Sequence, residues 1–188
     1  MKYLIVGLGN PGDEYTLTRH NIGFLILESL SDKLSISFSG KRYGNVAQGR
    51  IKNKQLILLK PDTYMNLSGK AVRYYMQEEN ISKENILIVT DDLALPTGRL
   101  RIKTKGSDGG HNGLKSIQEL VAGQDYSRLR FGISNEFSKG KQVDYVLGKW
   151  SGEEWPIVQK SIIKSVEAIE SFVLAGPAIT MNKFNTAG

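Results

Sequence analysis

The chain has 188 residues, of which 40% are hydrophobic and 23% are charged, a composition typical of a folded globular protein rather than a disordered chain. It contains no cysteine, which excludes disulfide bonds, thiolate metal sites and a cysteine nucleophile. The formal net charge is +6, no apolar stretch approaches the roughly 20 residues of a membrane span, and no signal peptide is recognisable, so we expect one cytoplasmic domain over residues 1–188 without membrane contact.

The first half of the chain predicts a strand, a helix, a hairpin and a second helix. The apolar run KYLIVGL (2–8) is typical of a buried strand, because it is short, β-rich and closed by glycine. Apolar residues at helical spacing from Ile22 to Leu30 predict a helix that begins between Thr18 and His20. The hairpin strands and the second helix are predicted over residues 46–51, 55–60 and 67–80.

The second half continues the alternation of strands and helices. Turn residues and periodicity predict a buried strand, an exposed strand, a helix opened by an asparagine, a further strand and a long helix that ends at Gly176-Pro177. These elements span residues 84–92, 97–106, 112–123, 126–134 and 151–176. The pattern predicts an α/β fold, a single domain with a mixed, twisted β-sheet flanked by helices on both faces.

Two segments carry cations at every second position. In GRLRIKTKG (98–106) and SRLRFGIS (127–134) the alternating cations are Arg99, Arg101, Lys103, Lys105, Arg128 and Arg130. Side chains two apart on a strand share one face at a spacing of roughly 7 Å, which is close to the spacing of successive phosphates. Because a solvent-exposed face usually mixes charges of both signs, the pattern favours a polyanionic partner over simple solvation.

The stretch GLGNPGDEYTLTRHNIG (7–23) follows the first predicted strand and contains the pattern G-x-G-x-x-G. A dinucleotide site is one interpretation, but Pro11 and the residues after Gly12 look like a loop rather than the start of a helix. The acidic residue that such a site places at the end of a second strand is also missing. The glycines are better explained by a sharp turn that brings Asn10 to the carboxyl edge of the sheet.

His20 stands at the predicted start of a helix, where the positive end of the helix dipole favours a neutral, basic imidazole. A histidine base needs an acid that orients its other ring nitrogen. Asp91, after the buried strand ILIVT, would lie at the same sheet edge, and Asp92 is the alternative. The chain has no G-x-S-x-G elbow, and its two histidines lie in dissimilar loops without a metal motif, so we expect water activated directly by histidine and no metal.

Asn66 in TYMNLSG and Asn112 in GSDGGHNG each stand at a predicted loop-to-helix junction. Asparagine is a good N-cap, so each residue has a purely structural interpretation. The alternative is that both present their amides to a carbonyl group and a water molecule. Each residue alone favours the cap, but together with Asn10 they supply uncharged donors around one histidine, so both interpretations stay open.

Five segments together resemble bacterial-type peptidyl-tRNA hydrolase in order, spacing and nearly full length: VGLGNPGDEYTLTRHNIGF, KPDTYMNLSG, DDLALPTGRLRIK, GGHNGLKSI and LRFGIS, with the closing MNKFN. The resemblance implies a monomeric α/β enzyme that hydrolyses the ester between a peptide, or N-blocked aminoacyl group, and the 3′-terminal ribose of tRNA. Such an enzyme recycles ribosome-free peptidyl-tRNA and uses neither a metal nor an organic cofactor.

The resemblance also implies roles for matching residues. His20 would accept a proton from water, Asp91 would stabilise the basic form of His20, and Asn10 would help to separate N-blocked peptidyl-tRNA from ordinary aminoacyl-tRNA. The acylated 3′ end would contact Tyr15, Tyr64, Asn66 and Asn112, with Met65 as a wall of the cleft. The distant 5′ phosphate would be held by Lys103 and Arg130.

The chain departs from the family at TDDLALP, where many relatives have a sequence close to HDELDLP. Thr90 replaces a histidine and Ala94 replaces an acid, whereas the carboxylate of Asp91 is kept, so we expect the base to work in altered surroundings. Tyr64 stands where phenylalanine is common. Two weaker alternatives are an RNA-binding module that does not need His20 and a nucleotide-dependent enzyme.

Overall fold

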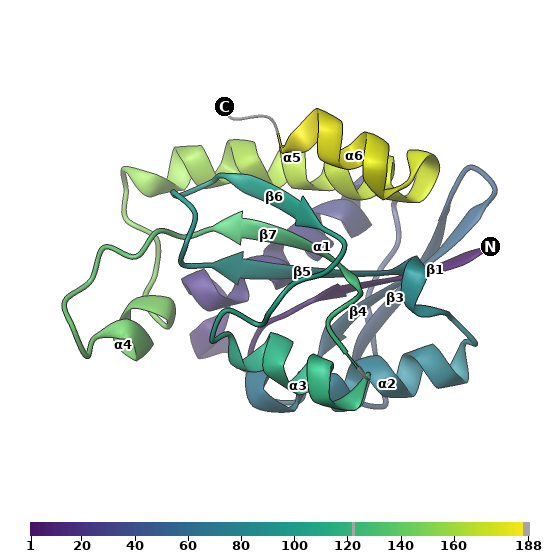
Figure 1. Ribbon diagram of the computed structural model, residues 1–188, viewed down its shortest axis with the longest axis horizontal. Helices are drawn as coiled ribbons and strands as arrows, with labels where there is room; N and C mark the ends of the chain where they lie inside the picture. The colour runs from purple at the N-terminus through teal and green to yellow at the C-terminus, as the bar shows by residue number, and fades with distance from the viewer. Residues whose placement is uncertain (122, 186–188) are drawn as a thin grey trace.

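The computed structural model describes residues 1–121 and 123–185 (Figure 1). The strands are β1 (Lys2–Gly7), β2 (Ser39–Lys41), β3 (Gly44–Ile51), β4 (Lys54–Pro61), β5 (Ile86–Asp92), β6 (Leu100–Lys103) and β7 (Ser127–Gly132). The α-helices are α1 (Ile22–Lys33), α2 (Ser68–Glu78), α3 (Asn112–Leu120), α4 (Gln142–Val146), α5 (Glu154–Ala175) and α6 (Pro177–Phe184). Residue 122 of the predicted helix 112–123, and residues 186–188 of the predicted domain, lie outside the described residues.

The described strands form one mixed sheet in the order β2-β3-β4-β1-β5-β7-β6. β4, β1, β5 and β7 run parallel, whereas β2, β3 and β6 pair antiparallel with their neighbours. Helices α1 and α5 cover one face, and α2 and α3 cover the other (Figure 1). The predicted α/β fold with helices on both faces is confirmed.

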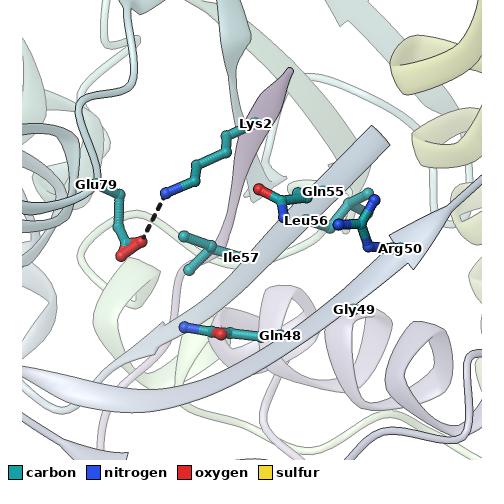
Figure 2. A pocket seen from close by; sticks show the side chains of 8 residues that line it. All are labelled: Lys2, Gln48, Gly49, Arg50, Gln55, Leu56, Ile57 and Glu79. Carbon is teal, nitrogen blue, oxygen red and sulfur yellow. Dashed lines mark hydrogen bonds and ion pairs between the residues drawn. The ribbon is translucent and has the colours of Figure 1, made fainter. Parts of the chain in front are cut away.

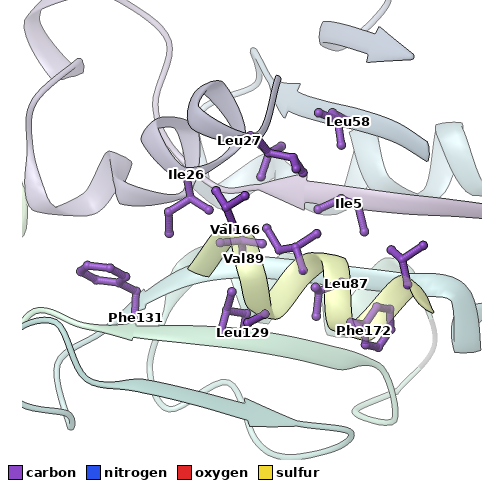
Figure 3. Close-up of a cluster of buried hydrophobic side chains, with 14 of the residues drawn as sticks. Ile5, Ile26, Leu27, Leu58, Leu87, Val89, Leu129, Phe131, Val166 and Phe172 are labelled. Atoms are coloured by element: carbon purple, nitrogen blue, oxygen red, sulfur yellow. The ribbon is translucent and has the colours of Figure 1, made fainter. Parts of the chain in front are cut away.

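A hydrophobic cluster lies on each face of the sheet, and β1 contributes to both. Tyr3 and Ile5 pack with side chains of α1 and α5, the cluster that Figure 3 shows, whereas Leu4 and Val6 pack with side chains of α2 and α3. A strand that is buried on both faces needs a continuous apolar run, which is why KYLIVGL shows no alternation.

Close packing of α1 explains two glycines of the first loop. A Cβ on Gly7 would lie 2.3 Å from the carbonyl oxygen of Gly23, and one on Gly23 would lie 2.6 Å from the carbonyl oxygen of Val89. α1 therefore packs directly on β1 and β5. Gly12 turns the chain with a φ of 113°, but α1 begins only at Ile22. Because the third glycine of the pattern opens no α-helix, the geometry argues against a dinucleotide site.

Three short or late elements were not expected from the sequence. β2 has three residues, α4 has five, and α6 follows directly after the predicted stop at Gly176-Pro177. Pro177 occupies the first position of α6, where a missing N–H is tolerated, so the same dipeptide ends one helix and starts the next. No helix in the described part of the chain is long and apolar enough to cross a membrane.

The two ends of the parallel strands differ in chemistry. At the amino ends, a hollow of about 330 Å³ is lined by polar side chains including Lys2, Arg50 and Gln55, and an ion pair of 3.3 Å joins Lys2 Nζ to Glu79 Oε1 (Figure 2). None of its lining residues is a histidine. Both histidines of the chain line the cavity at the carboxyl ends, and histidine is the side chain that most often serves as a general acid or base.

Candidate active site

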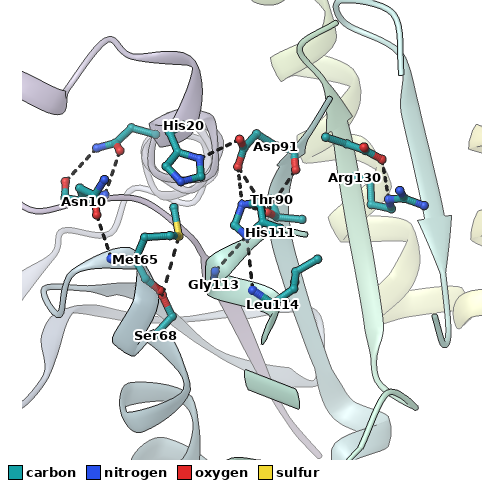
Figure 4. A network of polar contacts seen from close by, with 12 residues as sticks. Asn10, His20, Met65, Ser68, Thr90, Asp91, His111, Gly113, Leu114 and Arg130 are labelled. Carbon is teal, nitrogen blue, oxygen red and sulfur yellow. Dashed lines mark hydrogen bonds and ion pairs between the residues drawn. The ribbon is translucent and has the colours of Figure 1, made fainter. Parts of the chain in front are cut away.

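β5 ends in a buried carboxylate that contacts two histidines from different loops (Figure 4). Asp91 Oδ2 lies 2.8 Å from His20 Nδ1, and Asp91 Oδ1 lies 2.7 Å from His111 Nε2. Because β1 and β5 are parallel neighbours, the segments after them meet at one sheet edge. Asp92 points elsewhere: its Oδ1 accepts the backbone N–H of Ala94 at 2.8 Å. The geometry thus places Asp91, and not Asp92, against His20.

The surrounding hydrogen bonds decide which nitrogen of each ring carries a proton. His111 is the N-cap of α3, and its Nδ1 accepts the backbone N–H groups of Gly113 and Leu114 at 3.1 and 3.3 Å. A backbone N–H group can only donate, so Nδ1 of His111 must be the unprotonated nitrogen. Nε2 of His111 therefore carries the proton and donates it to Asp91. Nδ1 of His20 donates to the other oxygen of Asp91. Nε2 of His20 is therefore left with a free lone pair, and it has no hydrogen-bond partner among the described residues.

The pKa shifts of Asp91 and His20 follow from the contacts. Burial would raise the pKa of Asp91, but the interactions with His20 and His111 hold it well below its usual range, so Asp91 is a carboxylate. Burial lowers the pKa of His20, whereas the charge of Asp91 and the hydrogen bond to it raise that pKa, and the net direction is upward. The proton affinity of His20 therefore depends on Asp91.

The same three residues approach the geometry of a metal site, since their ligand atoms all lie within 4.8 Å of one another. The environment of His111 does not fit that use. A neutral histidine that binds a metal through Nε2 carries its proton on Nδ1, but Nδ1 of His111 faces two backbone N–H groups. Coordination would turn both hydrogen bonds into repulsive contacts, so the donor set favours proton transfer over metal binding.

Asn10 is held in place by three hydrogen bonds. Its Oδ1 accepts the backbone N–H of Met65 at 2.8 Å, and its backbone N–H and C=O bind the side-chain amide of Asn21 at 2.8 and 2.9 Å. The N–H of Met65 requires an acceptor, which fixes the orientation of the Asn10 amide. Nδ2 of Asn10 has no partner among the described residues. Asn10 thus presents a donor with its oxygen already engaged.

A cavity of about 380 Å³ opens beside His20 and Asp91. Of the predicted site residues it also contains Asn112 and Arg130, and α4 and residues 107–110 form further walls. The other predicted site residues do not line this cavity: Asn10, Tyr15, Tyr64, Met65, Asn66 and Lys103. Tyr64 is 57% exposed, whereas Met65 is buried against Asn10 and Ser68.

The structural interpretation of Asn66 and Asn112 as N-caps is wrong. The residue at the N-cap of α3 is His111, whose ring nitrogen binds the helix amides, and the N-cap of α2 is Leu67, without a side-chain hydrogen bond. Both asparagine side chains are exposed. Their amides are therefore available for other contacts, as the second interpretation requires.

Sequence reasoning missed His111, although the residue lies beside the asparagine that was singled out. A histidine that follows two glycines and precedes a predicted helix is a usable signal, because it stands at an N-cap position. Its contact with Asp91 was not readable, since it depends on how α3 packs beside β5. Asn21 was also missed, and no local pattern distinguishes it.

The cationic rows are only partly as expected. Arg128 is 1% exposed, and its guanidinium donates to the backbone carbonyl groups of Gly106, Gln124 and Tyr126, so its place in an exposed row is wrong. β6 spans only residues 100–103, so Lys103 lies on the strand and Lys105 beyond it. Arg130 borders the cavity, where its Nε lies 2.6 Å from Asp92 Oδ2. Of the two predicted rows, what remains is Arg130 at the cavity and the cations on or next to the edge strand β6.

Residues 4–188 match the family described as peptidyl-tRNA hydrolase. The chain belongs to this family. The peptidyl-tRNA hydrolase of Porphyromonas gingivalis is 57% identical over 98% of this chain and 100% of its own length, and that of Bacillus pumilus is 45% identical over 96% of each. The crystal structure of peptidyl-tRNA hydrolase from Acinetobacter baumannii superposes with a TM-score of 0.93 at 39% identity, over 98% of this chain and 94% of that one. The bacterial-type resemblance is confirmed, and the chain is a hydrolase of the ester bond in peptidyl-tRNA.

The departures from other peptidyl-tRNA hydrolases leave the contacts of Asp91 in place. Thr90 is fully buried, and its Oγ1 lies 3.0 Å from His111 Nε2 and 3.4 Å from Asp91 Oδ1. Ala94 contributes only its backbone N–H, to Asp92. Thr90 thus adds a hydroxyl to the polar network, and Asp91 still accepts from both histidines.

Proposed function

We propose that His20 is the general base of ester hydrolysis in peptidyl-tRNA. Nε2 of His20 removes a proton from water, and the water oxygen attacks the carbonyl carbon of the ester. The bond from that carbon to the ribose oxygen then breaks, and the leaving oxygen takes the proton back from His20. The observation that carries this proposal is the free lone pair on Nε2, beside a cavity, with Nδ1 donating to a buried carboxylate.

The rate enhancements expected from these residues are sufficient for hydrolysis of an ester. A positioned general base typically supplies about 10²–10⁴-fold, and a donor to the developing oxyanion supplies about 10²–10³-fold more. Asn112 lines the cavity and is the first candidate for a donor to the carbonyl oxygen or the water, and Asn66 is the second. A covalent intermediate is not required, because a carboxylic ester is easier to cleave than an amide. We propose that no metal or cofactor takes part.

The same proposal is tested by release of a labelled N-acetyl amino acid from tRNA, with the unacetylated aminoacyl-tRNA as control. We expect rapid release from the acetylated substrate, slow release from the control, and no effect of a chelator on either. If the chelator abolishes activity and an added divalent cation restores it, metal independence is contradicted, since direct activation of water by His20 needs no ion.

We also propose that Asn10 reads the blocked amino terminus of the substrate. Its oxygen is engaged by Met65, so the amide offers N–H groups. The carbonyl oxygen of a peptide or acetyl group accepts such a bond, whereas the α-ammonium group of aminoacyl-tRNA only donates and would be desolvated without a partner. This mismatch supports discrimination by Asn10 without any charged residue.

Asn10→Asp tests this role with almost no change of shape. The aspartate still accepts the N–H of Met65 but replaces the free donor by an acceptor. We expect kcat/KM for N-acetyl-aminoacyl-tRNA to fall by about tenfold, the scale of one lost hydrogen bond, and kcat/KM for the unacetylated substrate to rise. Initial rates on both substrates measure the ratio, and an unchanged ratio would show that the selectivity lies elsewhere.

The tRNA body is proposed to contact the cationic residues beyond the cavity, with Lys103 and Arg130 at the 5′ phosphate. Arg130 is paired with Asp92 in the free protein, so binding of a phosphate would exchange one anion for another. Tyr15, Tyr64 and Met65 are proposed to border the acylated 3′ end. Monomeric action in the cytoplasm, which the family resemblance implies, also belongs to this proposal.

Lys103→Gln is expected to weaken tRNA binding most strongly at low salt. The slope of log K against log salt concentration is negative, and removal of one phosphate contact reduces its magnitude by about 1. The exposed residue Lys164 on α5 provides a matched control, since Lys164→Gln removes the same charge. Filter binding of deacylated tRNA over a salt series measures both, and equal slopes for the two variants would remove Lys103 from the interface.

A further inference from the structure

The residue next to His20 has contacts that the proposed reaction does not use. The side chain of Arg19 is only 12% exposed. Its Nη2 donates to Glu154 Oε1 at 2.9 Å, and its Nη1 donates to the backbone carbonyl of Tyr145 at 3.1 Å. The guanidinium carbon also lies 4.1 Å from the centre of the Tyr145 ring and 5.6 Å from that of Trp150. Arg19 thus joins the loop between β1 and α1 that carries His20 (residues 8–21, the His20 loop) to α4 and to the start of α5.

One of those segments is a wall of the catalytic cavity. Gln142, Val143 and Val146 of α4 line the cavity, yet α4 has five residues and none of them is buried. A helix this short has no stability of its own in water, so contacts outside it must hold it in place. Figure 1 shows α4 standing off the body of the fold, at the end where β5 and β7 finish.

Several of the contacts that hold α4 and the residues after it come from the His20 loop. The backbone N–H of Arg19 donates to the carbonyl of Gly148 at 2.9 Å, and Thr18 forms an antiparallel bridge with Lys149. The hydroxyl of Tyr145 donates to the carbonyl of Ile133. The side chain of Arg19 binds the carbonyl of Tyr145 and covers the same residue's ring, while Tyr145 and Val146 also pack against the hydrophobic cluster between the sheet and α1 and α5.

The partner of Arg19 is itself fixed. Glu154, at the start of α5, accepts the backbone N–H of Ser151 at 2.8 Å and the hydroxyl of Thr97 at 3.4 Å. A half-buried carboxylate with these donors favours a planar guanidinium, which donates in two directions and stacks on rings, over a lysine ammonium. The site is therefore built for arginine.

We propose that Arg19 is a positioning residue that ties α4 to the His20 loop, so that the wall around the acyl-bearing end of the substrate keeps a fixed place relative to the base. The proposal rests on the proposed function of this cavity. The apolar side chains of Val143 and Val146 suit the acyl group better than phosphate, so Arg19 acts on substrate binding. His20 itself stays in place through Asp91.

Steady-state kinetics on N-acetyl-aminoacyl-tRNA test the proposal in Arg19→Ala and Arg19→Lys. If α4 occupies its bound position only a tenth of the time, the apparent affinity falls in proportion, so we expect KM to rise by about tenfold in Arg19→Ala and by a smaller factor in Arg19→Lys. We expect kcat to change by less than about threefold, with an unshifted pH profile, because the interaction lost is one of binding. Added methylguanidinium should lower the raised KM of Arg19→Ala part of the way to the wild-type value, and it should not change the KM of Arg19→Lys.

Two further measurements keep the outcome interpretable. Hydrogen exchange of the amides of residues 142–148 should become faster in Arg19→Ala while exchange in β1 and β5 stays slow, and this readout does not depend on activity. Arg50→Ala, which removes an exposed cation at the amino ends of the strands, should change neither KM nor exchange.

Unchanged KM and unchanged exchange in Arg19→Ala would overturn the proposal, as would a fall in kcat with a shifted pH profile, which would place the effect on His20. Global loss of protection in Arg19→Ala together with a wild-type KM in Arg19→Lys would also overturn it. If the wild-type chain fails to cleave the substrate while exchange at residues 142–148 still responds to Arg19→Ala, the proposed function fails and the tie between Arg19 and α4 stands.

Discussion

Replacing His20 by alanine is expected to lower kcat by about 10²–10⁴-fold, the contribution typical of a positioned general base. The imidazole is the group at the cavity whose free nitrogen can take a proton from water, since the second histidine has both nitrogens engaged. Binding of tRNA should persist, because the proposed tRNA contacts lie on other residues. Single-turnover release of N-acetyl amino acid measures the chemical step, and filter binding measures affinity.

His111→Asn is the matched comparison for this experiment. Both histidines contact the same carboxylate, but only His20 keeps a free lone pair, so the loss in His111→Asn should be far smaller than in His20→Ala. An asparagine at position 111 can still cap α3. If the two variants lose kcat equally, the assignment of the base to His20 is wrong. If His20→Ala retains wild-type turnover, no general-base role is left for it.

Much of the fold was readable from the sequence because tertiary packing agrees with local pattern. The parallel strands β1 and β5 are buried on both faces, which demands the continuous apolar runs that were recognised. The hairpin of β3 and β4 and the helices α1 and α2 were likewise expected at nearly their observed bounds. β2, α4 and α6 were not readable, because short elements draw their stability from contacts that local periodicity does not encode.

The candidate site divides in the same way. Asn10 follows the end of β1 and Asp91 is the last residue but one of β5, and the rule that parallel strands present their carboxyl ends at one edge brings such residues together. Alternation alone placed Arg128 in an exposed row, but its guanidinium is buried by the carbonyl groups of residues 106, 124 and 126. Alternation at every second position shows that side chains share one face of a strand, but it does not show what covers that face. The role of His111 as a cap was missed for a different reason, since the neighbouring asparagine has the higher capping preference.

Asp91→Asn is expected to lower kcat strongly, by at least about 10²-fold, because an amide cannot replace the carboxylate between two N–H donors. Asp91 accepts from His20 on one oxygen and from His111 on the other. An asparagine has one acceptor, so its NH₂ group must face one of the two histidines. If it faces His20, Nδ1 becomes the acceptor and Nε2 carries the proton, which removes the free lone pair from the cavity.

The pH dependence of the same variant separates this effect from a general loss of structure. A His20 that serves as the general base acts only when neutral, so its raised pKa is expected to place the rising limb of kcat/KM above the ordinary histidine value of about 6.5. Asp91→Asn removes the charge that raises this pKa and leaves the burial that lowers it, so the limb should move to lower pH as the plateau falls. Asp92→Asn removes only the ion pair with Arg130, so the rising limb should stay in place. A limb that moves in Asp92→Asn and stays fixed in Asp91→Asn would reverse the assignment of the two acids, because only the carboxylate in contact with the base can set its proton affinity.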